Sequence, residues 1–179
     1  KKGIRFVEDS LDVDTVVGAG TIGLELSTLN VIPDIVIVPL GNGALINGIA
    51  MAIKNVLPNT RTMGIQSVNA PAMIESWKTG KTVTHSNIET ICDGIGVRVP
   101  VAEALEEMKE LIDDGLLVSE KDLVYAMRLM QSHAGLMVEP SAAVGLAAML
   151  ENRELFTGKT VALILTGSNL TAQQVEQWF

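Results

Sequence analysis

Cysteine, basic clusters and long apolar runs are all scarce in this sequence. Its single cysteine, Cys92, cannot form an internal disulfide, which excludes a disulfide framework and indicates a reducing compartment. No basic cluster accompanies the formal net charge of −8, so nucleic acids and anionic membranes are excluded as partners. No stretch is apolar enough to span a bilayer, and no signal peptide opens the chain. These absences predict a cytoplasmic protein.

The remaining composition is that of a globular protein. Hydrophobic residues make up 47% of the 179 residues and charged residues 19%, which excludes a disordered chain. That length predicts one domain over residues 1–179 with a sizeable core, and there is no repeat, low-complexity tract or linker. The first residue is Lys1 rather than Met, which indicates either removal of an upstream segment or excision from a longer protein.

Strand-like and helix-like segments alternate along the chain. Continuous apolar runs typical of buried strands are separated by segments with helical periodicity. This pattern predicts an α/β fold with three layers, in which a mainly parallel sheet is covered by helices on both faces. Strands are predicted at residues 35–40, 61–68, 115–118 and 160–165, and helices from residue 21 and at residues 44–56, 70–78, 101–113, 119–133, 141–151 and 172–178.

A glycine-rich turn interrupts the apolar pattern directly after the first predicted strand. Gly41 and Gly43 flank Asn42, and a predicted helix begins at Ala44. Glycines let backbone N–H groups turn toward a ligand, and the start of a helix adds unpaired N–H groups and a positive dipole end. The turn therefore has two interpretations, a phosphate cradle or an ordinary strand-to-helix connection.

Two further segments have a functional and a structural interpretation. Thr166 follows the last predicted strand, where its hydroxyl could donate to an aromatic ring nitrogen or simply begin a turn. Glu139 precedes Pro140 and Ser141 at the start of a helix rich in Ala and Gly, where it could serve a site or balance the helix dipole. The small residues of this helix predict close packing against another element.

Near the amino terminus, Gly18, Gly20 and Gly23 match the spacing G-x-G-x-x-G, just before a helix predicted from Thr21. In dinucleotide-binding proteins this fingerprint follows a strand and precedes an acidic residue that ends the next strand. Neither feature is found here, and Asp34 comes too early. The glycine spacing is therefore weak evidence for NAD binding.

Taken together, several segments resemble the large domain of fold-type II pyridoxal-phosphate enzymes, the tryptophan-synthase-β superfamily. The closest likeness is to the branch of threonine/serine dehydratases and serine racemases. The motifs stand in the family's order and spacing and cover nearly the whole chain. They are GAGTIGLEL at residues 18–26, VPLGNGALINGIA at 38–50, TICDGIGVR at 90–98, VEPSAAVGLAAML at 138–150 and LTGSNL around Thr166.

The resemblance implies pyridoxal 5'-phosphate as the cofactor and assigns roles to residues of this chain. The backbone of the glycine-rich turn would hold the cofactor phosphate, and Thr166 would face the pyridine nitrogen. Glu139 matches a glutamate near the cofactor. Asn42 and Ala44 depart from the family's all-glycine run, but each keeps a backbone N–H. The implied cofactor-binding residues are Gly41, Asn42, Gly43, Ala44, Leu45, Glu139 and Thr166.

No metal site is expected. One family member binds a divalent metal through two carboxylates and a carbonyl, at positions that match Gln66, Ala70 and Ala72 here. Divalent metals prefer charged oxygen ligands, which these residues lack, although carbonyls could hold a monovalent ion. His85 and His133 have no ligand-spaced partners and are interpreted as surface or hydrogen-bonded residues. Cys92 is interpreted as a small buried residue rather than a nucleophile.

The family's Schiff-base lysine and the loop that binds the substrate carboxylate belong to the amino-terminal half, which this sequence lacks. Its own lysines lie on polar helix faces, in turns or, for Lys1 and Lys2, at the terminus. None has the apolar setting that activates an amine. The resemblance therefore implies an incomplete catalytic unit that is inactive alone.

With its missing portion, the protein would be an ammonia-lyase that converts a β-hydroxy amino acid to a 2-keto acid and ammonia, in a homodimer. Three alternatives stay open: a β-replacement enzyme, a racemase, and a non-catalytic module that binds a phosphate ligand.

Overall fold

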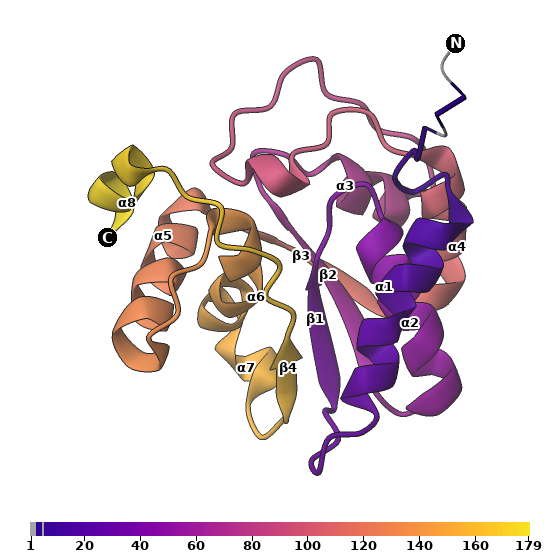
Figure 1. The fold of residues 1–179 in the computed structure, drawn as a ribbon, viewed down its shortest axis with the longest axis horizontal. Helices are drawn as coiled ribbons and strands as arrows, with labels where there is room; N and C mark the ends of the chain where they lie inside the picture. Colours follow the sequence, from indigo (N-terminus) through magenta and orange to yellow (C-terminus); the bar gives the residue numbers. More distant parts are fainter. Residues whose placement is uncertain (1–2, 5) are drawn as a thin grey trace.

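Four apolar runs pair into one parallel sheet in the computed structural model, which describes residues 3–4 and 6–179. Within these residues the strand order is β3-β2-β1-β4, so β1 and β2 form the centre of the sheet (Figure 1). The predicted fold class is confirmed. The strands are β1 (Ile35–Pro39), β2 (Arg61–Ser67), β3 (Asp114–Val118) and β4 (Val161–Leu163).

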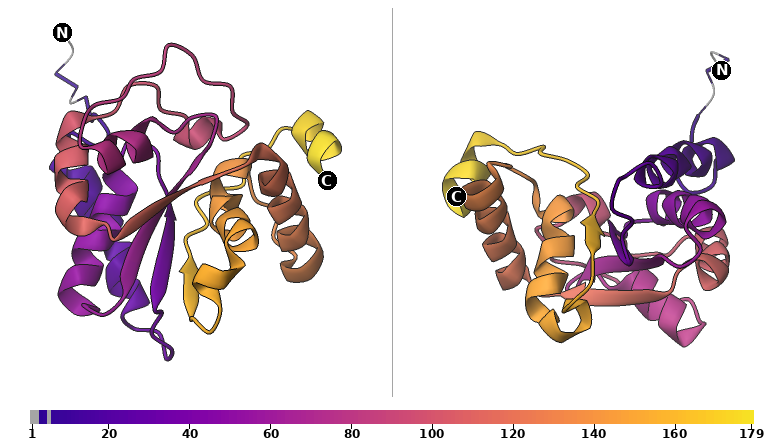
Figure 2. Two further views of the ribbon diagram at one scale, coloured as in Figure 1. Left: turned by 180° about the vertical axis from the view of Figure 1, so that it is seen from behind. Right: turned by 90° about the horizontal axis from the view of Figure 1, so that it is seen from below.

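Helices cover both faces of the sheet, as Figure 2 shows in its right view. Helices α2, α3 and α4 pack on one face, while α5 and α6 pack on the other and α1 lies outside α2. No helix in the described part of the chain is long and apolar enough to cross a membrane. The helices are α1 (Val13–Leu26), α2 (Ala44–Val56), α3 (Ala72–Thr79), the 3-10 turn η1 (Asp93–Ile95), α4 (Ala102–Leu111), α5 (Glu120–Leu129), the π-helical turn η2 (Met130–Ala134), α6 (Pro140–Glu151), α7 (Arg153–Phe156) and α8 (Ala172–Trp178).

Strand β1 is buried on both faces, as its unbroken apolar run predicts. Val36 and Val38 face α2, whereas Ile35 and Ile37 face α6. On α6, Gly145 lets the helix approach the sheet, because an added Cβ would lie 3.3 Å from Ile37 Cγ2 and 3.1 Å from Leu163 Cδ2. The expected close packing of the small residues of α6 is therefore confirmed, and it fixes β1 between two helices.

Helix α1 begins at Val13, so the predicted start near Thr21 is wrong. Gly18, Gly20 and Gly23 lie inside the helix, and the first strand of the described residues comes after it. Gly20 and Gly23 serve packing instead: an added Cβ on Gly23 would lie 2.7 Å from Ala52 Cβ, and one on Gly20 3.2 Å from Gly48 O. These glycines therefore do not form the strand–turn–helix arrangement of a dinucleotide site.

Strand β4 is shorter and less buried than predicted. Only Val161–Leu163 pair with β1, and all three are half-buried at the edge of the sheet. Beyond Ile164 the chain leaves the sheet because Glu139 binds it: the Glu139 N–H donates to Gly167 O at 3.1 Å, and its Oε2 accepts from Asn169 N at 2.9 Å.

Several predicted helix ends also shift, for local reasons. Helix α3 starts at Ala72, after Pro71 at its N-cap, rather than at residue 70. Helix α4 ends at Leu111, because Ile112 has extended backbone. Helix α5 ends at Leu129 rather than at residue 133, and a π-helical turn follows it from Met130 to Ala134. The predicted N-cap at Ser119 is confirmed, since its side chain accepts from Asp122 N.

The close α1–α2 contact makes one glycine on α2 irreplaceable. A Cβ on Gly48 would overlap Val16 O and lie 2.8 Å from Ala19 Cβ. We expect Gly48→Ala to lower the free energy of unfolding by about 1–3 kcal/mol through overpacking. Exposed Gly18, on α1, has no atom within 4 Å of an added Cβ. Gly18→Ala should therefore raise stability by up to about 1 kcal/mol. Urea denaturation measures both, and equal stabilities would contradict this packing.

Candidate functional site

A cavity of about 610 Å³ opens at the carboxyl end of β1. In open parallel sheets, ligands bind at this edge. Segments distant in sequence form its wall, namely the β1–α2 turn, the loop around η1, the start of α6 and the chain after β4. The lining residues are Asp9, Thr15, Ala19, Pro39, Gly41, Asn42, Ala44, Leu45, Asp93, Gly94, Ile95, Gly96, Val97, Glu139, Ser141 and Thr166.

The structure brings six of the seven predicted cofactor-binding residues to this cavity. Gly41, Asn42, Ala44 and Leu45 line it from the β1–α2 turn, whereas Glu139 and Thr166 line it from the opposite side of the sheet. The seventh, Gly43, lies between them as the buried N-cap of α2 with φ 111°. This left-handed backbone favours glycine, and an added Cβ would also lie 2.8 Å from Ala104 Cβ. Gly43 thus determines the backbone path of the turn without lining the cavity itself.

The turn leaves backbone donors available. Within the described residues, no hydrogen bond uses the N–H groups of Gly41, Asn42, Gly43 or Leu45. The N–H of Ala44 is different, because it donates to Ser10 Oγ at 3.0 Å. Unpaired donors at the first turn of a helix, with the positive end of its dipole, form an anion-binding arrangement.

Asp9 and Ser10 are site residues that the sequence did not reveal. Besides the Ser10 contact, Asp9 Oδ2 accepts from Asn42 Nδ2 at 2.7 Å, so this segment lies directly against the turn. Ser10 has φ 67°, the only positive value among the described non-glycine residues. Ser141 also lines the cavity, although the sequence indicates only that it lies at the start of a helix. Its buried Oγ has no hydrogen-bond partner among the described residues.

Glu139 binds the chain that carries Thr166. Its carboxylate accepts from Asn169 N and lies against Gly167, where an added Cβ would be 2.7 Å from Oε1. The exposed Thr166 is thereby held beside the cavity. Glu139 therefore has a structural role, which is to hold residues 167–169 against the start of α6.

Among the residues that the structure describes, three acidic side chains and no lysine or arginine line the cavity. The described lysines are all exposed, on helices or in turns, while Lys1 and Lys2 lie outside the described residues. An exposed lysine lacks the apolar setting that favours Schiff-base formation. Within the described residues, backbone donors rather than cationic side chains are therefore what the cavity offers to an anion.

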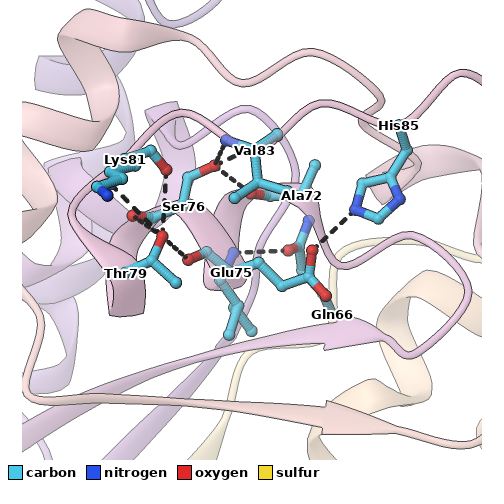
Figure 3. Close-up of polar contacts among 9 residues, drawn as sticks. Gln66, Ala72, Glu75, Ser76, Thr79, Lys81, Val83 and His85 are labelled. Atoms are coloured by element: carbon cyan, nitrogen blue, oxygen red, sulfur yellow. Dashed lines mark hydrogen bonds and ion pairs between the residues drawn. The ribbon is translucent and has the colours of Figure 1, made fainter.

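The stretch compared with a metal site contains no charged ligand. Figure 3 shows Gln66 beside α3, where its Oε1 accepts from Ile74 N at 2.9 Å. Among the described residues, no group of three His, Cys, Asp or Glu side chains could hold a metal ion. His85 Nε2 lies 2.8 Å from Glu75 Oε2, and exposed His133 contacts Ser132 Oγ at 2.8 Å. Both histidines are thus hydrogen-bonded polar residues, as expected.

Cys92 belongs to the loop around η1 that forms one wall of the cavity, and its side chain is fully buried in the core. Burial raises the pKa of its thiol to about 12, and the nearby Glu120 carboxylate adds to the shift. The thiol is therefore protonated at neutral pH, which confirms the prediction of a small buried residue rather than a nucleophile.

Residues 1–167 match the family model described as pyridoxal-phosphate dependent enzyme. The chain belongs to this family. The cofactor predicted from the motifs is therefore confirmed as the family's cofactor, whereas the contact of each residue with it stays a prediction.

Two curated relatives are similar over almost the entire chain. The L-threonine ammonia-lyase of Thermotoga maritima is 34% identical over 179 residues, which are 99% of this chain and 44% of that protein. The catabolic L-threonine dehydratase of Escherichia coli K12 is 34% identical over 98% of this chain and 54% of its own length. The chain thus spans about half the length of these relatives.

Solved structures show the same likeness. Processed threonine deaminase isoform 2 from Solanum lycopersicum has a TM-score of 0.90 at 28% identity, over 98% of this chain and 52% of that chain. Maize serine racemase has a TM-score of 0.83 at 30% identity, over 91% and 52%. The resemblance to the dehydratase and racemase branch is thereby confirmed.

The buried thiol should be unreactive in the folded chain. Because its pKa is raised to about 12, almost no thiolate exists at pH 8. We expect Ellman's reagent at pH 8 to label Cys92 only slowly in the native chain, and stoichiometrically after unfolding in urea. Rapid labelling of the native chain would contradict the burial of Cys92.

Proposed function

We propose that this chain supplies the cofactor-binding portion of a pyridoxal-phosphate-dependent ammonia-lyase. The substrate would be a β-hydroxy amino acid such as threonine or serine, and the products a 2-keto acid and ammonia. One observation carries the proposal: the β1–α2 turn, Glu139 and Thr166 converge on a single cavity at the carboxyl end of the sheet. The relatives named for threonine deamination support the choice of reaction.

The residues of the turn fit a phosphate group. The free N–H groups of Gly41, Asn42, Gly43 and Leu45 would donate to it, aided by the α2 dipole. Ala44 has a lesser part in this proposal, because its N–H already donates to Ser10. Ser10 accepts that bond and keeps its own hydroxyl proton, which leaves the hydroxyl able to donate in turn.

Thr166 would donate its hydroxyl to the pyridine nitrogen. A hydroxyl does not hold that nitrogen protonated as a carboxylate would, so the ring is a weaker electron sink. When bound, pyridoxal phosphate supplies this sink for the charge that develops at the substrate Cα. A hydroxyl at Thr166 would therefore suit an elimination better than chemistry that needs a strong electron sink. The role of Glu139 is to hold residues 167–169, and hence Thr166, in place.

The proton-transferring lysine would come from a portion of the enzyme that this chain does not contain. Two observations support this division. The chain spans 44% and 54% of two relatives, and none of the described lysines lines the cavity. The chain alone would therefore be inactive, and the whole enzyme would be a homodimer, as is common in the family. The absence of a lining lysine equally fits the alternative, a non-catalytic module that binds a phosphate ligand.

Cofactor binding can be tested with two glycines of similar backbone. Gly43 and Gly80 both have positive φ, but only Gly43 belongs to the turn at the cavity. Alanine at either site costs about 1–2 kcal/mol of backbone strain. At Gly43 the added Cβ would also lie 2.8 Å from Ala104 Cβ, which displaces the turn, whereas at Gly80 it meets no atom within 4 Å. We expect only Gly43→Ala to weaken pyridoxal phosphate binding, by about tenfold or more, because it displaces charge-assisted donors. Isothermal titration calorimetry measures the dissociation constants.

Equal affinities of the two glycine variants would remove the turn from the site. Thr166→Val, which deletes only the hydroxyl, should weaken binding of pyridoxal phosphate and leave binding of inorganic phosphate unchanged. Loss of both affinities would instead indicate that the substitution disturbs the cavity.

Activity separates the enzyme from the binding module. With added pyridoxal phosphate, the chain alone should release no 2-keto acid from threonine or serine. Addition of a lysine-bearing amino-terminal portion should restore turnover. Turnover by the chain alone would refute the proposed division, and a complemented protein that binds cofactor without turnover would support the module. A sulfide nucleophile in the same assay would reveal β-replacement as a new thiol product.

A further inference from the structure

Residues 80–101, between α3 and α4, form a long loop whose only helical turn is η1 (Figure 1). The loop crosses the carboxyl edge of the sheet, and its residues 93–97 supply one wall of the cavity. Gly94 O and Ile95 Cα each lie 3.6 Å from the position of a Cβ on Gly41, so this wall abuts the β1–α2 turn. With so little secondary structure, the loop depends on side-chain contacts for its position.

Glu120, the first residue of α5, binds this loop from outside the cavity. Its Oε1 accepts from Thr90 Oγ1 at 2.6 Å and from Ser67 Oγ at 2.6 Å. Its Oε2 accepts from Ile91 N at 3.1 Å. Ser67 ends β2, so one carboxylate ties the loop both to the sheet and to the start of α5. Hydrogen bonds to an ionised acceptor are stronger than neutral ones.

The contact continues from Glu120 to the cavity through adjacent residues. Thr90 Oγ1 also accepts from Cys92 N at 3.0 Å, and the Cys92 side chain is buried in the core. Cys92 O accepts in turn from Ile95 N at 3.1 Å, which closes the η1 turn. Ile95 is itself buried and lines the cavity. Each step is a direct contact, so displacement at Thr90 moves the wall.

We infer that Glu120 is a positioning residue for the cofactor site. It holds the wall formed by residues 93–97 against the β1–α2 turn without touching the ligand. The inference deepens the proposed function and rests on it for the identity of the ligand. A purely structural alternative exists, because an acidic residue in the first turn of a helix also stabilises that helix through its dipole.

Four variants distinguish the two roles. Glu120→Ala removes all three hydrogen bonds, and Thr90→Val removes the loop's hydroxyl while leaving α5 unchanged. Glu120→Gln keeps the tether, because its amide can donate to the hydroxyl oxygens of Ser67 and Thr90 while its carbonyl accepts from Ile91 N. Glu110→Ala is the matched control, since Glu110 is an exposed glutamate on α4.

Hydrogen–deuterium exchange of the chain reads the position of the loop directly. In Glu120→Ala and Thr90→Val, exchange should accelerate at residues 90–97 and stay unchanged in β1 and β2. Calorimetry should show pyridoxal phosphate binding about tenfold weaker in Glu120→Ala, as expected for lost bonds to a charged acceptor. The double variant should be no weaker than Glu120→Ala, because both changes break one tether. Glu110→Ala should match the parent, and Glu120→Gln should fall between the parent and Glu120→Ala, because it keeps the hydrogen bonds but loses the charge.

Three results would overturn the inference. They are unchanged exchange at residues 90–97, acceleration confined to α5 or spread through the sheet, and a Glu120→Gln variant as impaired as Glu120→Ala. Should Glu120→Ala fail to fold, Thr90→Val decides the question by the same measurements. Should the parent chain not bind pyridoxal phosphate, the proposed function fails, while the exchange data still test whether Glu120 holds the loop.

Discussion

The left-handed backbone of Gly43 is the constraint on which the site depends. Only residues 40–43 separate β1 from α2, and the backbone of Gly43 lets the helix start there, so that its first turn faces the edge of the sheet. Strand β1 is fixed between α2 and α6, and α2 is fixed in turn by α1 packing on Gly48. The unpaired donors of the turn are thus held in place by packed elements on both sides of β1 and α2, as pre-organised anion binding requires.

The cavity combines these donors with three carboxylates, and the structure shows how the two coexist. Each carboxylate accepts a hydrogen bond from the wall itself. Asp9 accepts from the Asn42 side chain, Asp93 from Gly94 N and Glu139 from Asn169 N. Each carboxylate is thereby partly satisfied by a protein hydrogen bond rather than by a turn N–H. The same bonds position the wall, so the acidic residues contribute to its shape as well as to its potential.

Sequence reasoning succeeded where neighbours along the chain decide the structure. The apolar run of β1, the start of α2 after Gly43 and the cap at Ser119 were all recognisable from local pattern. Gly20 and Gly23 misled because a glycine that permits close helix packing looks, in sequence, like a helix breaker. Ser10, which contacts a residue 34 positions away, and Glu120, which contacts one 30 positions away, were invisible because only the fold brings them together. The family motifs pointed to residues that line the cavity but not to the residues that support them.

The exposed edge of strand β4 affects how readily separate copies of this chain associate. It is the outermost strand of the described sheet on its side, and its half-buried apolar residues border peptide groups that no neighbouring strand satisfies there. Such a border is a template on which further strands can assemble. The net charge of −8 opposes that growth by mutual repulsion between copies, and dissolved salt weakens the repulsion. Higher ionic strength is therefore expected to favour association of copies of this chain through their β4 edges.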